Sequence, residues 1–134
     1  MATGLFFKLE FILLSMKPVY TYKAHVIKVV DGDTIDCSVD LGFNTKTDVR
    51  FRIYTDDHSY FDTPETWRPK TEEEAKHGSQ AKARASELLE GQEIVLKSVK
   101  EGKYRYLAEV FLPDGRNYAN VMIEEGYQKR DNYK

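Results

Sequence analysis

Val29-Val30-Asp31-Gly32-Asp33-Thr34-Ile35 decides the fold, because two strand-like runs meet at its Asp-Gly-Asp turn. Residues 22–30 and 34–40 are rich in β-branched and aromatic side chains, which predicts an antiparallel hairpin. Gly32 is expected to take backbone angles that other residues avoid in such a turn. Alternation along the first strand puts three residues on one face, namely Ala24, Val26 and Lys28.

A third strand follows over residues 47–54, after a turn at residues 41–47 that contains Gly42 and Asn44. Within it, the period of two sends the apolar side chains of Val49-Arg50-Phe51-Arg52-Ile53 to one face and both arginines to the other. A guanidinium binds a phosphate oxygen well through its planar fork. The strand therefore predicts a polar face that could contact a phosphate.

The second acidic cluster is Phe61-Asp62-Thr63-Pro64-Glu65-Thr66, a loop in which Pro64 cannot donate a ladder hydrogen bond. Carboxylate oxygens are the ligands that Ca²⁺ and Mg²⁺ prefer. If the fold brings this loop to the Asp31–Asp33 turn and to the arginine strand, the three segments would hold a cation beside a phosphate.

The remaining segments predict two helices and two further strands. Thr71-Glu72-Glu73-Glu74 has the form of a capping box, but Gly78 interrupts the pattern, so the helix is expected from Ser79 to a stop at Gly91. Strands are expected at residues 93–99 and 106–112, and a helix at 118–125 with Asn117 as its cap. This order indicates an α+β fold, a five-stranded OB-type barrel with two to three helices.

Composition bounds the classes of function. The 134 residues carry 20 Lys+Arg against 22 Asp+Glu, a net charge of −2, so contact with a polyanion needs a local patch or a metal. The single cysteine, Cys37, allows no disulfide within the chain and is interpreted as a small packed residue rather than a nucleophile.

Residues 1–16 differ from the rest of the chain. They are apolar but contain Lys8 and Glu10, are too short to span a bilayer as a helix, and lack a basic start and a cleavage site of the Ala-x-Ala kind. A strand, an extension upstream of Met16 and a degraded signal peptide are all compatible with them. We expect an accessory segment at 1–16, a single domain at 17–134, and a location that is either cytoplasmic or secreted.

Several motifs then agree in their order along the chain. They are Asp31-Gly32-Asp33-Thr34, the arginine strand, Asp62-Thr63-Pro64-Glu65, Lys103-Tyr104-Arg105-Tyr106-Leu107-Ala108 and Asp114-Gly115. Together they resemble the staphylococcal (thermonuclease-like) nuclease family from about His25 to about Arg130. The resemblance implies an OB-type barrel and calcium-dependent hydrolysis of the phosphodiesters of DNA and RNA.

The resemblance also implies a role for individual residues. Asp33, Asp62 and the backbone carbonyl of Thr63 would bind Ca²⁺. Arg52 and Arg105 would bind the scissile phosphate, and Glu65 would act as general base or position the attacking water. Lys103 and Tyr104 would hold a neighbouring phosphate or sugar.

Plainer interpretations stand beside these roles. Asp31 and Asp33 are also common turn residues, Arg50 suits a solvated strand face, and Glu65 is a frequent residue in the first turn of a helix. The histidines, His25, His58 and His77, have no mutual metal spacing and are expected at the surface. Trp67 and most tyrosines are expected to pack rather than to stack on bases.

The chain departs from the family pattern in two places. Residues 55–61 replace a Gly and one apolar residue, so they either bulge outward and leave the site intact or displace Asp62 and Glu65 from Arg52. The second departure is a missing Gly between Tyr104 and Arg105, which would turn Arg105 to the other face unless the turn near Gly102 absorbs the change.

Three classes of function follow. The first is a Ca²⁺-dependent endonuclease that acts on DNA, RNA or both, as a monomer with no stable protein partner and no membrane span. The alternative is an OB-fold module with weak or no catalysis that binds nucleic acid or protein. A metal-binding domain without nuclease chemistry is the third, and it leaves the arginines without a role.

Overall fold

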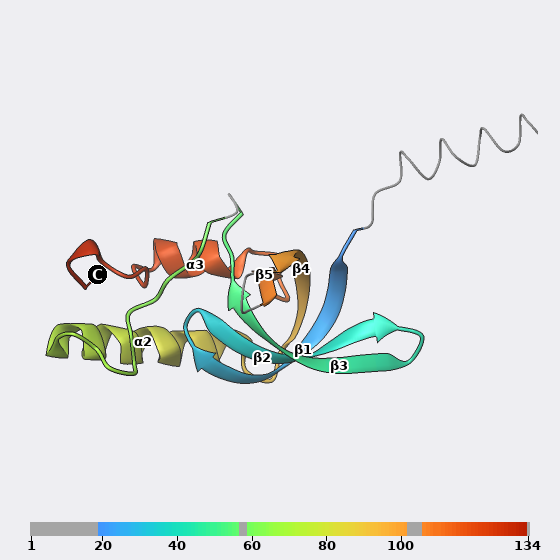
Figure 1. Ribbon diagram of the computed structural model, residues 1–134, viewed down its shortest axis with the longest axis horizontal. Helices are drawn as coiled ribbons and strands as arrows, with labels where there is room; N and C mark the ends of the chain where they lie inside the picture. Colours follow the sequence, from blue (N-terminus) through green and yellow to red (C-terminus); the bar gives the residue numbers. More distant parts are fainter. Residues whose placement is uncertain (1–18, 57–58, 102–105, 134) are drawn as a thin grey trace, which may run out of the picture.

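The protein forms a closed barrel of five strands in this computed structural model, which describes residues 19–56, 59–101 and 106–133 (Figure 1). The order of elements is β1 (Thr21–Asp31), β2 (Thr34–Gly42), β3 (Thr45–Ile53), α2 (Glu72–Leu89), β4 (Glu93–Glu101), β5 (Tyr106–Phe111), α3 (Tyr118–Glu124) and a 3-10 helix at Asp131–Tyr133. Around the barrel the strands run β1-β2-β3-β5-β4. The α+β prediction of a five-stranded OB-type barrel carrying helices is confirmed.

Closure of the barrel depends on one parallel pair. β1, β2 and β3 form a continuous antiparallel meander, β4 pairs with β1 and β5, and β5 closes the ring against β3 in parallel, with Phe51 opposite Tyr106. A parallel neighbour requires a long crossover, and the segment that holds α2 and β4 supplies it. The end of β3 thereby lies beside the start of β5.

The core follows the predicted alternation except in β1. Phe51 and Ile53 are buried, as expected, and so is Cys37, where burial raises the thiol pKa to about 12. The pairing of β1 with β2 shifts between Val26 and Lys28, however, so that Lys28 is exposed and the next residue, Val29, is buried. The prediction that Lys28 shares a face with Ala24 and Val26 was wrong, because a bulge adds a residue to the alternation.

Helix α2 is longer than the sequence predicted. It runs without a break from Glu72 to Leu89, and the Thr71 hydroxyl caps it by accepting the Glu74 N–H at 3.0 Å. Gly78 does not end the helix. Its lack of a side chain instead allows the Pro64–Glu65 backbone to approach α2 closely. A Cβ atom there would lie 2.7 Å from the carbonyl oxygen of Glu65 and 2.8 Å from that of Pro64.

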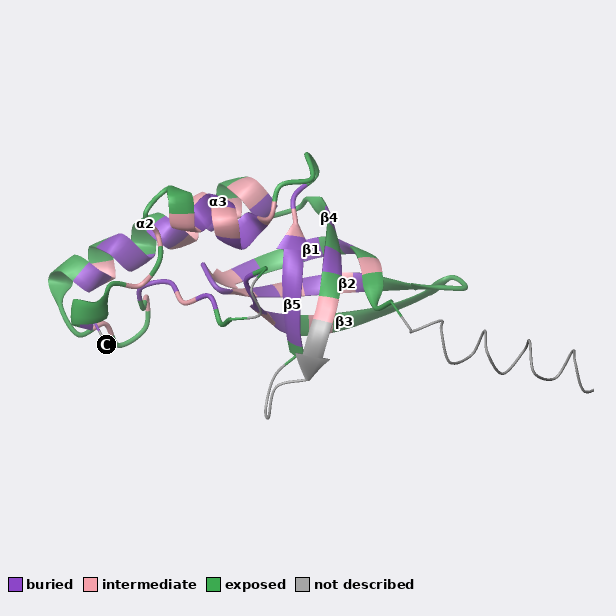
Figure 2. Cartoon of the chain, turned by 90° about the horizontal axis from the view of Figure 1, so that it is seen from above, coloured by how far each residue is buried: buried purple, intermediate pink, exposed green. Residues whose placement is uncertain are grey.

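The α-helices of the described residues, α2 and α3, lie at one end of the barrel, and each carries buried residues (Figure 2). α2 packs against β1, and Asn117 caps α3 as predicted, accepting the Asn120 N–H at 3.2 Å. In the described part of the chain, no helix is both long and apolar enough to cross a bilayer. The accessory segment expected at residues 1–16 lies outside the described residues.

Gly78→Ala should lower the free energy of unfolding by about 1–3 kcal/mol, because the methyl group must push the Pro64–Glu65 backbone away from α2. Urea unfolding followed by circular dichroism would measure the change. Ser79→Ala, at the exposed neighbouring helical position, is the matched control and should change stability by less than about 0.5 kcal/mol. Equal stability of the two variants would show that the backbone contact at Gly78 is not a constraint.

Candidate nuclease site

The β1–β2 turn and the loop at Asp62–Glu65 are joined by direct contacts. Asp33 accepts the backbone N–H of Thr63 at 3.1 Å through one carboxylate oxygen, and the Thr34 hydroxyl at 2.9 Å through the other. A Cβ atom at Gly32 would lie 2.7 Å from Cγ2 of Thr63. Gly32 is not among the glycines with positive φ, so its predicted conformational role was wrong. The close approach of Thr63 requires this glycine.

The chain insertion at residues 55–61 leaves the loop in place. Tyr54 and Tyr60 pair as an isolated antiparallel bridge, and the Thr55 N–H donates to the carbonyl of Ser59 at 2.8 Å. The insertion is therefore a hairpin closed at its base, although residues 57 and 58 lie outside the described part. Its last residue, Phe61, is fully buried, and the next residue, Asp62, forms an ion pair with Arg52. The insertion therefore leaves Asp62 in contact with Arg52.

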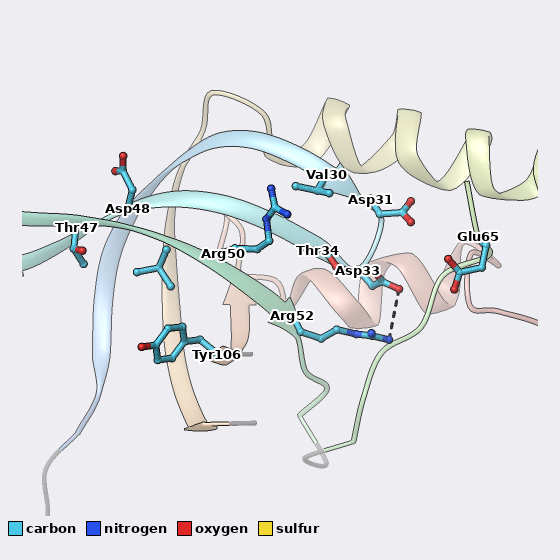
Figure 3. Close-up of a pocket in the computed structure, with 11 residues that line it drawn as sticks. Val30, Asp31, Asp33, Thr34, Thr47, Asp48, Arg50, Arg52, Glu65 and Tyr106 are labelled. Carbon is cyan, nitrogen blue, oxygen red and sulfur yellow. Dashed lines mark hydrogen bonds and ion pairs between the residues drawn. The ribbon is translucent and has the colours of Figure 1, made fainter. Parts of the chain in front are cut away.

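Arg52 lies between two carboxylates. Its Nη2 is 3.7 Å from Asp33 and pairs with Asp62, and the arginine side chain is only 19% exposed (Figure 3). Its Nε is buried and has no hydrogen-bond partner among the residues that the structure describes. A buried, unsatisfied donor is costly unless a ligand supplies the acceptor. The guanidinium thus keeps a free donor beside two acidic groups.

The arginine lines one side of an acidic cleft of about 760 Å³, between the end of β3 and the loop that carries Glu65. Asp31 and Glu65 point their carboxylates toward one another across it (Figure 3). Burial, and then repulsion from Asp33 and Glu65, raise the pKa of Asp31 to about 6. The cleft therefore holds more negative charge than its own arginines offset.

Glu65 has a basic partner that the sequence pattern did not indicate. Lys129 Nζ lies 3.5 Å from Glu65 and 3.7 Å from Glu74, which is fully buried. The backbone N–H of Lys129 also donates to the carbonyl of Asp62 at 2.8 Å. The residue is 64 positions from Glu65 in the numbering and belongs to no recognisable motif, so only the fold could reveal it.

Comparison with known proteins agrees with this geometry. Residues 59–134, more than half of the chain, match the sequence model of the family described as staphylococcal nuclease homologue. The chain belongs to this family. No curated protein matches it. The family match begins after Asp33 and Arg52, so the contacts described above are what bring these two residues to the matched loop.

Three other residues that the sequence singled out, Arg50, His25 and His77, have partners of their own. Arg50 is exposed and donates to the carboxylate of Asp36 at 2.7 and 3.1 Å, as expected for a solvated strand face. His25 is exposed and contacts Glu93 at 2.6 Å. His77, expected at the surface, is buried instead, with Nε2 2.8 Å from the carbonyl oxygen of Gly126. From α2 its side chain packs against the segment that follows α3.

Three residues implied by the family resemblance, Lys103, Tyr104 and Arg105, lie outside the described residues, as does His58. Tyr106, the first described residue after them, is half exposed and lines the cleft next to β3. Strand β5 therefore begins beside the cleft, and the roles of Lys103, Tyr104 and Arg105 stay predictions.

The predicted ligands have the right chemistry for a hard cation, but in this structure their carboxylates contact Arg52. Asp33, Asp62 and the Thr63 carbonyl would offer oxygen atoms only, as Ca²⁺ prefers. Within the described ranges no three His, Cys, Asp or Glu side chains form a group that could hold a metal ion. The predicted set contains only two such side chains, and Arg52 contacts both in this structure. A cation would thus compete with the guanidinium for them.

Asp31→Asn should stabilise the protein at pH 8 in the presence of EGTA and leave its stability nearly unchanged at pH 4. The folded-state pKa of about 6 exceeds the ordinary 3.8, so the parent loses stability as the pH rises through this window and the carboxyl ionises. The shift sets a ceiling of about 3 kcal/mol, and solvent screening of this half-buried group reduces the expected gain to about 1 kcal/mol. Asparagine keeps the acceptor for the Gly32 N–H.

Urea unfolding at both pH values measures the effect, with Asp48→Asn, an exposed carboxylate of the same cleft, as control. A gain of equal size at pH 4 and pH 8 would show that charge at Asp31 is not its cause.

Proposed function

We propose that the domain, residues 17–134, hydrolyses phosphodiester bonds of DNA or RNA in a Ca²⁺-dependent reaction. The observation that carries the proposal is the position of Arg52 between Asp33 and Asp62, in a cleft that Glu65 also lines. Family membership supports the general class of nuclease. The calcium requirement and the roles of the single residues are the proposed part.

The carboxylates of Asp33 and Asp62, with the carbonyl of Thr63, would hold the Ca²⁺ ion. A bound divalent ion supplies positive charge that offsets the repulsion between a phosphodiester anion and an incoming oxygen nucleophile. The cleft is lined by more carboxylates than arginines, and this excess of negative charge favours binding of such a cation.

Arg52 would act on the substrate phosphate. When a phosphate enters, the guanidinium can exchange its carboxylate partners for two phosphate oxygens, and its unpaired Nε gains an acceptor. Fixed positive charge at the equatorial oxygens is worth most in the transition state, where negative charge is greatest. Arg105 is the proposed second arginine, with Lys103 and Tyr104 at a neighbouring phosphate or sugar.

Glu65 would accept a proton from the attacking water at one of its carboxylate oxygens, or orient that water. Its carboxylate is half exposed and faces the cleft, so water can reach it (Figure 3). Lys129 Nζ, 3.5 Å away, holds Glu65 from the side of α2. The water would attack phosphorus on the side opposite the leaving oxygen.

A digestion assay tests the function. Supercoiled plasmid and a structureless RNA are incubated with the protein in Ca²⁺, in Mg²⁺ and in EGTA. Cleavage of nucleic acid in Ca²⁺ that stops in EGTA is the expected result. Binding of either nucleic acid without cleavage in any of the three buffers would overturn the nuclease proposal in favour of a binding module.

The metal ligands can be tested by calcium titration in a calorimeter. Asp33→Asn and Asp62→Asn should each weaken Ca²⁺ binding by at least about tenfold, since each removes a charged oxygen ligand. Asparagine keeps an acceptor for the Thr63 N–H at position 33, so the loop should stay in place. Asp48→Asn, in the same cleft but without contact to Arg52 among the described ion pairs, is the matched control. Unchanged affinity in both variants would place any metal elsewhere.

Arg52→Lys should lower kcat by at least about 100-fold, because lysine keeps the charge but loses the planar fork. Arg50→Lys on the same strand face should cost no more than a few fold, since Arg50 is paired with Asp36. Steady-state cleavage of a labelled oligonucleotide measures all the variants. A silent Arg52→Lys would contradict the phosphate role.

Arg105→Lys, in the same assay, decides whether the second arginine takes part. A loss close to that of Arg52→Lys assigns it to the phosphate. A loss no larger than that of Arg50→Lys would show that Arg105 does not bind the phosphate. The missing Gly between Tyr104 and Arg105 would explain that result, because it turns Arg105 to the other face.

A further inference from the structure

The hairpin insertion puts an aromatic ring beside the proposed phosphate-binding arginine. Tyr60 is 53% exposed, and the guanidinium carbon of Arg52 lies 5.6 Å from the centre of its ring. The ring also meets buried Tyr54 edge to face, with centroids 5.3 Å apart and an interplanar angle of 81°. A large aromatic surface is thus open to solvent next to the guanidinium.

The segments on both sides of Tyr60 are anchored to the rest of the fold. Tyr60 pairs with Tyr54 across the base of the hairpin, and Asp56 near its tip accepts a hydrogen bond from the side-chain amide of Asn120 at 3.0 Å. The following residue, Phe61, is fully buried and packs edge to face on Tyr118, with centroids 6.3 Å apart. An aromatic ring that is already ordered loses little conformational entropy when a ligand binds to it.

We propose that Tyr60 is a stacking site for the nucleobase of a nucleotide adjacent to the scissile phosphate, an inference that rests on the proposed function. One sugar joins a base to its phosphate, so a phosphate bound at Arg52 brings a base within reach of a ring 5.6 Å from that guanidinium. Stacking on an aromatic side chain tolerates any base, because every base has a π face. The chain has a net charge of −2, so it gains no affinity for nucleic acid from overall charge. Stacking on Tyr60 would supply affinity that does not depend on charge.

The competing explanation is that the Tyr60 ring only positions Arg52 through a cation–π contact. Both explanations predict slower cleavage when the ring is removed. They differ in whether the loss depends on a base being present in the substrate, and this difference is measurable.

The test uses short oligonucleotides with one cleavable phosphodiester, all other linkages being methylphosphonates. One substrate carries every base, and two others lack the base on the 5′ or the 3′ side of the cleavable bond. For the parent protein in Ca²⁺, removal of one of these bases should lower kcat/KM by roughly tenfold. In Tyr60→Ala that penalty should disappear, and Tyr60→Phe should restore it. Equal losses in Tyr60→Ala on all three substrates would overturn the stacking site and leave only the positioning role.

Phe43→Ala is the matched control, because Phe43 is a fully exposed aromatic at the tip of the β2–β3 hairpin, away from the cleft. It should keep the base-dependent penalty of the parent.

A binding measurement in EGTA separates the two proposals. Tyr60→Ala should weaken binding of a labelled tetranucleotide by roughly tenfold, and should leave binding of the fully abasic tetranucleotide unchanged. That pattern without any cleavage in Ca²⁺ would end the nuclease proposal and retain the stacking site. Cleavage in Ca²⁺, together with binding that Tyr60→Ala weakens equally with and without bases, would keep the nuclease proposal and end the stacking site.

Discussion

The hydrogen bond from the Thr63 N–H to the carboxylate of Asp33 joins the two segments on which the site depends. It spans 30 residues of sequence and crosses from the β1–β2 turn to the loop before α2. The absence of a side chain at Gly32 allows the two backbones to approach, and the Tyr118 hydroxyl fixes the turn from below by donating to the Gly32 carbonyl at 2.7 Å. Without this contact the acidic turn and the acidic loop would be two separate surface features.

Sequence alone predicted the parts of this arrangement that repeat or that form a motif. The alternation in β3 identified the face of Arg52, and the order of acidic motifs identified Asp33 and Asp62 as partners in one site. The sequence could not reveal the role of Lys129, because a single lysine that contacts a carboxylate only in the folded chain leaves no local pattern. The burial of His77 was missed for the same reason. The roles of residues 103–105, which lie outside the described residues, stay predictions.

Gly32 and Gly78, the two glycines that contact the loop at residues 63–65, have a role that the sequence did not predict. Turn chemistry suggested a special conformation at Gly32, and helix propensity suggested an interruption at Gly78. In the structure both residues instead make room, Gly32 for the side chain of Thr63 and Gly78 for the carbonyls of Pro64 and Glu65. Propensity scales describe one residue and its neighbours in the chain, so they carry no information about a backbone that approaches from elsewhere. The same loop, residues 63–65, causes both requirements.

The contact between the Lys129 N–H and the Asp62 carbonyl has a consequence for biosynthesis. A chain still attached to the ribosome can form the β1–β2–β3 meander early, because its contacts are local. The loop that carries Asp62 and Glu65, however, is held by α3 and by Lys129, and a residue must clear the exit tunnel before it can fold back. The bond that holds the Asp62 carbonyl therefore forms only after Lys129 has emerged. A nascent chain that is shorter than this already contains Asp33, Arg52 and Asp62, but it lacks the contact that ties the Asp62 loop to the end of the domain.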